Sequence, residues 1–99
     1  TVKISGYRID LGEVECAASQ LPQIYLAGAV VHELESGHKE LWLGIEPRDK
    51  NTKIDIFSIK QQLRKILPSY MVPKRIKVFA ELPKMTNHKI NRRAIAEAI

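Results

Sequence analysis

Two apolar runs separated by a short polar turn constrain the fold of this chain more than any other feature. They extend from Ile24 to Leu34 and from Glu40 to Glu46, and both are rich in β-forming residues. The intervening stretch Glu35-Ser36-Gly37-His38-Lys39 has the composition of a hairpin turn. The sequence therefore predicts an antiparallel hairpin in the middle of the chain.

Three helices are predicted around this hairpin. The first follows a capping box in which Asp10 caps and Glu13 reaches back, and Pro22 ends it. Its apolar face carries Leu11, Val14, Ala18 and Leu21. The second is capped by Asp55 and runs to about Ile66, with Ile56, Ile59, Leu63 and Ile66 on its buried face. Asn91 caps a short last helix that contains Ile95 and Ile99.

Two further extended segments complete the expected order of elements. The segment from Val2 to Ile9 is extended with a bend at Gly6. The segment from Arg75 to Leu82 alternates strictly, which predicts a half-buried strand with Ile76, Val78, Ala80 and Leu82 on one face. We therefore expect a two-layer α+β domain. Its small, mostly antiparallel sheet has about three strands plus the N-terminal extended segment, and its three helices lie on one face.

Length limits what this domain can do alone. A chain of 99 residues with 44% hydrophobic and 27% charged residues is typical of one globular domain. It leaves little room for a deep pocket, so a complete two-substrate enzyme is not expected, and the missing initiator Met suggests one part of a longer chain. No apolar run reaches membrane-spanning length, so no membrane partner is expected. The single Cys16 is predicted to be a buried helix thiol, which fits a reducing, cytoplasmic setting.

The positive charge is concentrated in the last quarter of the chain. Residues 1–73 contain nine basic and nine acidic residues, whereas residues 74–99 contain seven basic and two acidic ones. This asymmetry is consistent with an anionic partner, such as a phosphate-bearing ligand or an acidic protein, although a merely solvated basic face is the alternative. Nucleic acid is not expected, because Phe79 is the only aromatic residue in the basic stretch.

Most standard catalytic constellations are missing from the sequence. It contains neither a G-x-x-x-x-G-K-[ST] loop nor a G-x-G-x-x-G turn, and no nucleophile–base pair is evident. The histidines His32, His38 and His88 are scattered without metal-ligand spacing, so no metal site is predicted.

One loop stands out, because it places a lysine between a strand and a helix start. Pro83 fixes the chain after the strand, Asn87-His88 forms a turn pair, and Lys89 lies at the tip. A lysine ammonium held in this way can be delivered to a carboxylate or phosphate oxygen. A solvated loop lysine is the alternative.

Three motifs resemble those of one family. The loop Pro83-Lys84-Met85-Thr86-Asn87-His88-Lys89-Ile90-Asn91-Arg92 is similar to P-x-T-x-N-G-K-[IV]-D-R, the closing motif of adenylate-forming enzymes. This family includes acyl-CoA synthetases, luciferases and the adenylation domains of nonribosomal peptide synthetases. Residues 2–15 resemble V-K-I-x-G-x-R-I-E-L-G-E-I-E, and residues 67–73 resemble L-P-x-Y-M-[VI]-P. The resemblance covers the family's small C-terminal subdomain, residues 1–99 here.

The resemblance implies a mobile subdomain that serves two half-reactions. In the first, Lys89 would bridge carboxylate and α-phosphate oxygens during acyl-adenylate formation. ATP with Mg²⁺ would be bound mainly by a large N-terminal subdomain that is absent here. After rotation, the face formed by Ser5, Gly6, Tyr7 and Arg8 would line the channel for a thiol acceptor, phosphopantetheine or CoA.

The resemblance also implies partners and an alternative role. Arg75, Lys77, Arg92 and Arg93 could dock an acidic carrier protein, whereas Arg8 could instead pair with Glu13 or Glu15. Tyr70, Met71 and Pro73 are expected to pack the second helix against the following strand. His88 stands at the family's Gly position, where a positive φ would be strained, Asn91 replaces the family's Asp, and Ser5 replaces a commonly basic residue. A catalytically silent subdomain that acts as a structural or docking module is the alternative function.

Overall fold

An antiparallel hairpin forms the centre of the molecule, as the two apolar runs predict. In the computed structural model, which describes residues 2–49, 51 and 53–99, strand β3 (Ile24–Glu33) pairs with β4 (Lys39–Pro47). Strand β5 (Arg75–Val78) lies parallel to β4, so the order of this sheet is β3-β4-β5. Because β5 alone is parallel, the sheet is mixed, and the α+β class with a mostly antiparallel sheet is confirmed.

The N-terminal extended segment is a separate two-stranded hairpin. Strand β1 (Val2–Ile4) pairs with β2 (Tyr7–Ile9) in the antiparallel sense. The turn residues Ser5 and Gly6 both have positive φ, 51° and 83°. Two successive positive φ angles are the signature of the tight turn that matches the twist of a hairpin. The predicted bend at Gly6 is therefore one half of this two-residue turn.

Each predicted helix forms, and each begins at its predicted cap. The helices are α1 (Leu11–Ser19), α2 (Ile56–Ile66) and α3 (Arg92–Ala98), and a 3₁₀ turn, η1, covers Ser69–Met71. The side chains that accept a hydrogen bond from a first-turn amide are Asp10 (from Gly12, 2.9 Å), Asp55 (from Phe57, 3.0 Å) and Asn91 (from Ala94, 3.1 Å). Such caps satisfy amides that the helix itself leaves unpaired. Across the described residues, no helix is long and apolar enough to cross a membrane.

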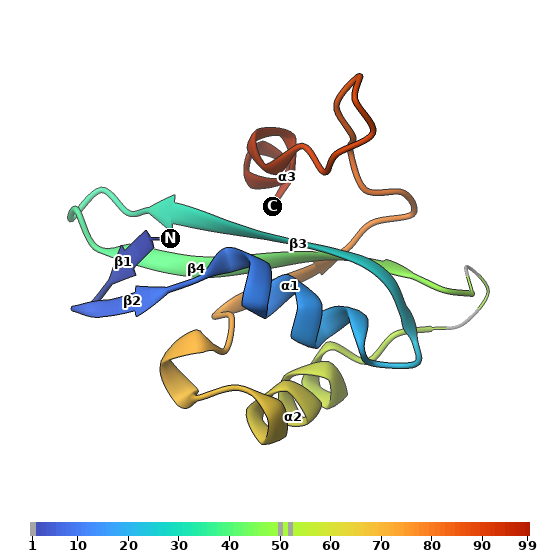
Figure 1. Cartoon of the computed structure of the whole chain (residues 1–99), viewed down its shortest axis with the longest axis horizontal. Coiled ribbons are helices and arrows are strands. Elements are labelled where there is room, and N and C mark those ends of the chain that lie inside the picture. The colour runs from blue at the N-terminus through green and yellow to red at the C-terminus, as the bar shows by residue number, and fades with distance from the viewer. Residues whose placement is uncertain (1, 50, 52) are drawn as a thin grey trace.

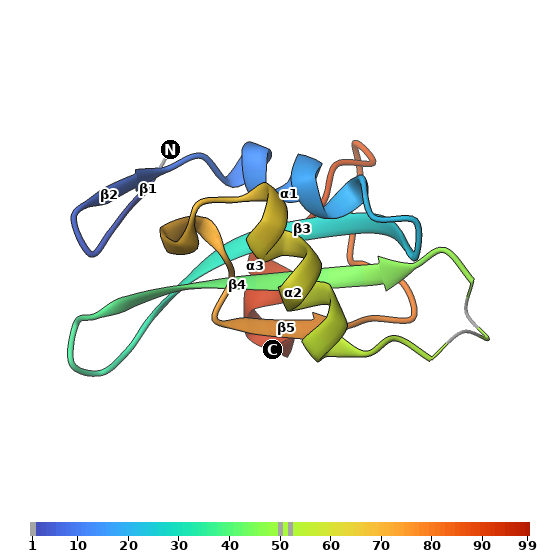
Figure 2. The same cartoon turned by 90° about the horizontal axis from the view of Figure 1, so that it is seen from below.

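The helices cover both faces of the three-stranded sheet, which differs from the expected two layers with all helices on one face. Figures 1 and 2 show α1 and α2 on one side of β3 and β4 and α3 on the other. The larger core lies under α1 and α2, and a smaller cluster of Val30, Trp42, Leu82 and Ile95 lies under α3. The cause is the sheet's second face, which is apolar as well and therefore needs its own cover.

Strand β5 is shorter than predicted, because the chain leaves the sheet after Val78. Ile76 packs in the larger core, whereas Leu82 packs in the cluster under α3. The expectation that these two residues share one face is therefore wrong. Beyond the end of β5, the Leu82 amide donates a hydrogen bond of 2.9 Å to Glu46 Oε1. This bond gives the buried Glu46 carboxylate a donor.

The helical periodicity predicted the buried positions Ile59 and Leu63 of α2, but Ile66, expected on the same face, is 46% exposed. It was also wrong about Cys16 in α1. Val14, Ala17, Ala18 and Leu21 are buried, whereas Cys16 is exposed, so the expectation of a buried thiol is wrong. Cys16 lies one residue before the buried pair Ala17-Ala18, and the 100° step between helical residues turns it away from the core.

Candidate functional site

The loop that carries Lys89 is a small closed turn with a fixed backbone. The His88 amide donates to the Met85 carbonyl (2.9 Å), and the Met85 amide donates to the Lys89 carbonyl (2.7 Å). The Asn87 side chain accepts from the Lys89 amide at 3.1 Å. These bonds hold the Lys89 backbone while its side chain stays exposed. A backbone fixed in this way reduces the entropy lost when the ammonium meets a ligand.

His88 adopts the conformation that the motif predicted for its position. Its φ is 66°, in the left-handed region that glycine adopts most easily. The turn therefore keeps the shape that glycine would give it, at a cost in backbone strain.

Both ends of the loop are attached to the body of the domain. The Asn91 amide donates to the Pro83 carbonyl over 2.9 Å, and an isolated antiparallel bridge pairs Lys84 with Ile90. Ile90 packs against the apolar cluster under α3. The loop is thus closed at its base where it meets α3.

A depression of about 400 Å³ adjoins the loop. The residues that line it are Glu15, Met85, His88, Lys89, Ile90 and Arg92. Within the described residues, Lys89 forms no ion pair, whereas the guanidinium of Arg92 pairs with Glu15. The Lys89 charge is therefore available to an anionic ligand.

Glu15 is the residue of this site that sequence reasoning did not place. Its Oε1 accepts from Arg92 Nη2 (2.7 Å), and its Oε2 accepts from Arg92 Nε (3.0 Å) and from the Ala29 amide (2.8 Å). The pair joins residues 77 positions apart, a separation that leaves no local signal in the sequence. Glu15 therefore pairs with Arg92 and not with Arg8, which the sequence offered as a possible partner.

The face formed by Ser5, Gly6, Tyr7 and Arg8 is the exposed tip of the β1–β2 hairpin. Tyr7 stacks on Tyr70 with ring centroids 4.3 Å apart and an interplanar angle of 9°. Met71 and Pro73 are buried as expected, but Tyr70 is 41% exposed and contacts this hairpin. Residues Ser5, Tyr7, Tyr70 and Lys74 help line a small depression of about 160 Å³.

The structure does not bring this hairpin and the Lys89 loop together. In Figures 1 and 2 the hairpin lies at one end of the sheet and the loop, between β5 and α3, lies toward the other.

The four predicted docking cations are dispersed and have contacts within the chain. Arg75 lies over the ring of Trp42 at 5.2 Å, and Lys77 Nζ donates to the Ala98 carbonyl at 2.6 Å. Arg93 forms a surface pair with Glu97 at 3.5 Å, while Arg92 pairs with Glu15. Arg75 and Lys77 lie on β5, whereas Arg92 and Arg93 begin α3.

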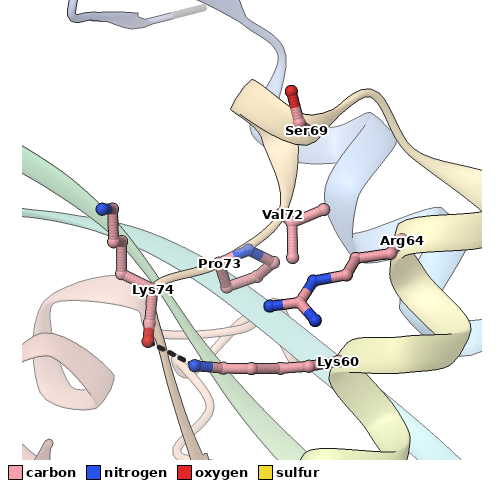
Figure 3. A pocket seen from close by; sticks show the side chains of 6 residues that line it. All are labelled: Lys60, Arg64, Ser69, Val72, Pro73 and Lys74. Carbon is pink, nitrogen blue, oxygen red and sulfur yellow. Dashed lines mark hydrogen bonds between the residues drawn. The ribbon is translucent and has the colours of Figure 1, made fainter.

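A second basic concavity lies beside α2 and was not predicted. Lys60 and Arg64, one helical turn apart, line a pocket of about 490 Å³ together with Val72, Pro73 and Lys74. In Figure 3 the side chains of Lys60 and Arg64 extend toward this segment, whereas the ammonium of Lys74 points away from them. Lys60 Nζ donates to the Lys74 carbonyl over 2.7 Å. The i,i+4 spacing of Lys60 and Arg64 could have indicated that the two cations lie on the same face of this helix.

The residues around Lys89 suit a phosphate or carboxylate group but not a metal ion. Lys89 contributes a cationic donor from which phosphate oxygens can accept, whereas the guanidinium of Arg92 is paired with Glu15. The part of the chain that the structure describes has no cluster of three or more His, Cys, Asp or Glu that could hold a metal.

Comparison with solved structures defines the class of fold. The amide bond synthetase McbA from Marinactinospora thermotolerans superimposes with a TM-score of 0.89 at 15% identity, over 99% of this chain and 20% of that one. A four-domain nonribosomal peptide synthetase, holo-AB3403 bound to AMP and glycine, gives a TM-score of 0.83 at 33% identity over 95% of this chain and 7% of that one. The first likeness shows the fold, and the second adds similarity in sequence.

Curated relatives match nearly the whole chain in sequence. The chain is 37% identical over 94 residues to a dimodular nonribosomal peptide synthase of Bacillus subtilis and 38% identical over 95 residues to a delta-poly-L-ornithine synthetase of Acinetobacter baumannii. Each alignment covers 95% of this chain but only 4% and 7% of the two relatives. No family model matches the chain. The chain is homologous to a C-terminal part of the adenylate-forming synthetases.

Proposed function

We propose that residues 1–99 form the mobile C-terminal subdomain of an adenylate-forming ligase and that Lys89 takes part in forming the acyl-adenylate. The observation that carries this proposal is the Lys89 loop: an exposed lysine that pairs with no acidic group among the described residues, on a turn whose backbone is fixed by hydrogen bonds. Homology to nonribosomal peptide synthetases over nearly the whole chain supports it.

In the proposed first half-reaction, a carboxylate oxygen of the substrate forms a bond to the α-phosphorus of ATP while the bond to pyrophosphate breaks. Lys89 Nζ donates hydrogen bonds to the carboxylate and α-phosphate oxygens. This contact holds the reacting groups together and neutralises charge that develops on the oxygens. The large N-terminal subdomain would hold most of the ATP, together with its Mg²⁺.

In the proposed second half-reaction, the hairpin tip replaces the Lys89 loop at the active site. Ser5, Gly6, Tyr7 and Arg8 then line the path of a phosphopantetheine or CoA thiol. Gly6 has no Cβ, so a ligand can approach its backbone closely. Because the hairpin and the Lys89 loop lie at separate ends of the sheet, one active site can use both only if the subdomain turns between the steps.

A carrier protein with an acidic surface is the proposed donor of the phosphopantetheine thiol. Arg75, Lys77, Arg92 and Arg93 remain the proposed docking cations. The Arg93 side chain retains 90% exposure, while the Arg92 side chain retains 48%. Charges of this kind increase the rate of encounter with an acidic partner.

The test of the proposed function is ATP–pyrophosphate exchange by the full-length synthetase with Lys89→Ala. We expect a loss of about 10²–10³-fold in kcat, the usual effect of removing one charge-stabilising donor. Lys84→Ala is the matched control, because Lys84 is an exposed lysine in the same loop and should keep the wild-type rate. Equal rates for wild type and Lys89→Ala would overturn the catalytic role and favour a structural or docking module.

A further inference from the structure

The ion pair between Glu15 and Arg92 ties the Lys89 loop to the rest of the domain. Arg92 is the first residue of α3 and follows Lys89 by three positions. Glu15 lies in α1, and its carboxylate also accepts from the Ala29 amide of β3. The Glu15 side chain therefore connects α1, β3 and α3 at the end of the Lys89 loop.

We propose that Glu15 and Arg92 are positioning residues for Lys89, an inference that rests on the proposed function. Two parallel N–H···O bonds of 2.7 and 3.0 Å fix both the distance and the plane of the guanidinium. This geometry is more directional than a contact with a lysine would be. Fixing Arg92 fixes the first turn of α3, and with it the base from which the Lys89 loop projects.

Burial makes this pair different from the other ion pair of α3. The Glu15 side chain is only 16% exposed, whereas Arg93 and Glu97 retain 90% and 70% exposure. Exposed pairs contribute little, because water screens them and long side chains lose entropy. A partly buried carboxylate with three donors loses more when one partner is removed.

The pair also protects the charge of Lys89. Glu15 and Lys89 line the same depression, and Arg92 occupies both oxygens of the carboxylate. Without Arg92, the Glu15 carboxylate would be partly buried and short of a cation, and it would attract the Lys89 ammonium. An ammonium drawn into such an internal pair is no longer available to substrate oxygens. Arg92 thus keeps the loop in place and keeps its lysine free.

The test uses the full-length synthetase with Glu15→Gln and Arg92→Gln in ATP–pyrophosphate exchange. We expect each to lower kcat about 10-fold or more with KM for ATP changed less than about twofold, the effect of a displaced catalytic group. In the Lys89→Ala background the same substitutions should change kcat less than about twofold, because they act through Lys89. Glu97→Gln is the matched control, since it removes the carboxylate of the exposed pair, and its kcat should equal that of the wild type.

A second readout needs no substrate. Amide hydrogen exchange over residues 83–91 of the unliganded protein should become at least about fivefold faster in Glu15→Gln and Arg92→Gln, because the closed loop opens more often. Glu97→Gln should leave it unchanged. The attraction of Lys89 to an unpaired Glu15 carboxylate is tested separately by the double variant Glu15→Gln/Arg92→Gln. This variant should recover part of the kcat that Arg92→Gln alone loses.

The outcomes separate this inference from the proposed function. If Lys89→Ala loses activity while Glu15→Gln and Arg92→Gln keep the wild-type kcat and exchange rates, the positioning role is overturned and the function of Lys89 stands. If Lys89→Ala keeps its activity, both fall together. Should the glutamine variants fail to fold, Arg92→Lys retains the charge but not the two parallel bonds, and a wild-type kcat in that variant would overturn the inference.

Discussion

At the scale of single residues, backbone conformation explains why unusual side chains still fit. His88 and Ser5 are the non-glycine residues with positive φ among those described, and each lies in a tight turn beside a candidate functional segment. The motif comparison predicted this conformation at His88, because its family position is a glycine. The hydrogen bonds around such a turn offset the free-energy cost of its strained backbone.

Replacing His88 by glycine should relieve that strain. His88→Gly is expected to raise the free energy of unfolding by about 1 kcal/mol, because glycine adopts a left-handed φ without the Cβ contact. Urea unfolding of the 99-residue chain measures the change. Asn87→Gly serves as the comparison, since Asn87 accepts from the Lys89 amide and its loss should lower stability. A less stable His88→Gly chain would contradict the prediction.

At the scale of elements, close approach between α3 and the sheet decides where the Lys89 loop lies. A Cβ built on Gly28 would come within 2.5 Å of Ile95 Cδ1, and one built on Gly44 within 2.9 Å of Ile95 Cγ2. Gly28 lies in the edge strand β3 and Gly44 in the central strand β4, so α3 can pack directly on the backbone of both. The smaller core forms only because these positions lack side chains.

Adding a methyl group at Gly28 should therefore push α3 away. Gly28→Ala is expected to lower the free energy of unfolding by about 1–3 kcal/mol, the usual effect of overpacking a tight core. Urea unfolding is again the measurement. The double variant Gly28→Ala/Ile95→Val should recover part of the loss, because the shorter side chain removes the clashing Cδ1. Full wild-type stability in Gly28→Ala alone would contradict the prediction, because it would show that α3 leaves room for a Cβ at residue 28.

The element scale also shows how far sequence reasoning reaches. The hairpin, the caps Asp10, Asp55 and Asn91, and the type of every helix follow from signals within a few residues, and all are confirmed. The end of β5 could not be predicted in this way. Its alternation continues to Leu82, but Leu82 packs under α3 and bonds to Glu46, which no local pattern encodes.

At the scale of the whole molecule, the two candidate functional segments lie apart on the same domain. The Lys89 loop is attached through α3, whereas the β1–β2 hairpin is attached through Ile4 and Ile9 in the larger core and through the stack of Tyr7 on Tyr70. Because the attachments are separate, damage to one segment should leave the other proposed half-reaction intact. This separation is what a subdomain that presents two faces in turn would need.

Loss of the tyrosine stack should affect the second half-reaction alone. Tyr70→Ala removes a contact of about 0.5–1.5 kcal/mol that holds the hairpin. In the full-length synthetase, we expect slower thioester formation and an unchanged rate of ATP–pyrophosphate exchange. Tyr70→Phe should behave as wild type, because it keeps the ring, and Tyr25→Ala is a control at another half-exposed tyrosine. A parallel fall in both half-reactions would contradict the separation of the two segments.

The sequence by itself determined the three capped helices, the central hairpin, the α+β class and the loop that presents Lys89. These depend on local patterns and on motifs whose residues are close together in the chain. Only the tertiary structure decided that α3 covers the second face of the sheet, that Cys16 is exposed, and that Glu15 pairs with Arg92. The physical reason is distance along the chain. Packing of the whole domain brings together partners that are 77 residues apart in the sequence. A sequence pattern that spans only a few residues cannot predict such a contact.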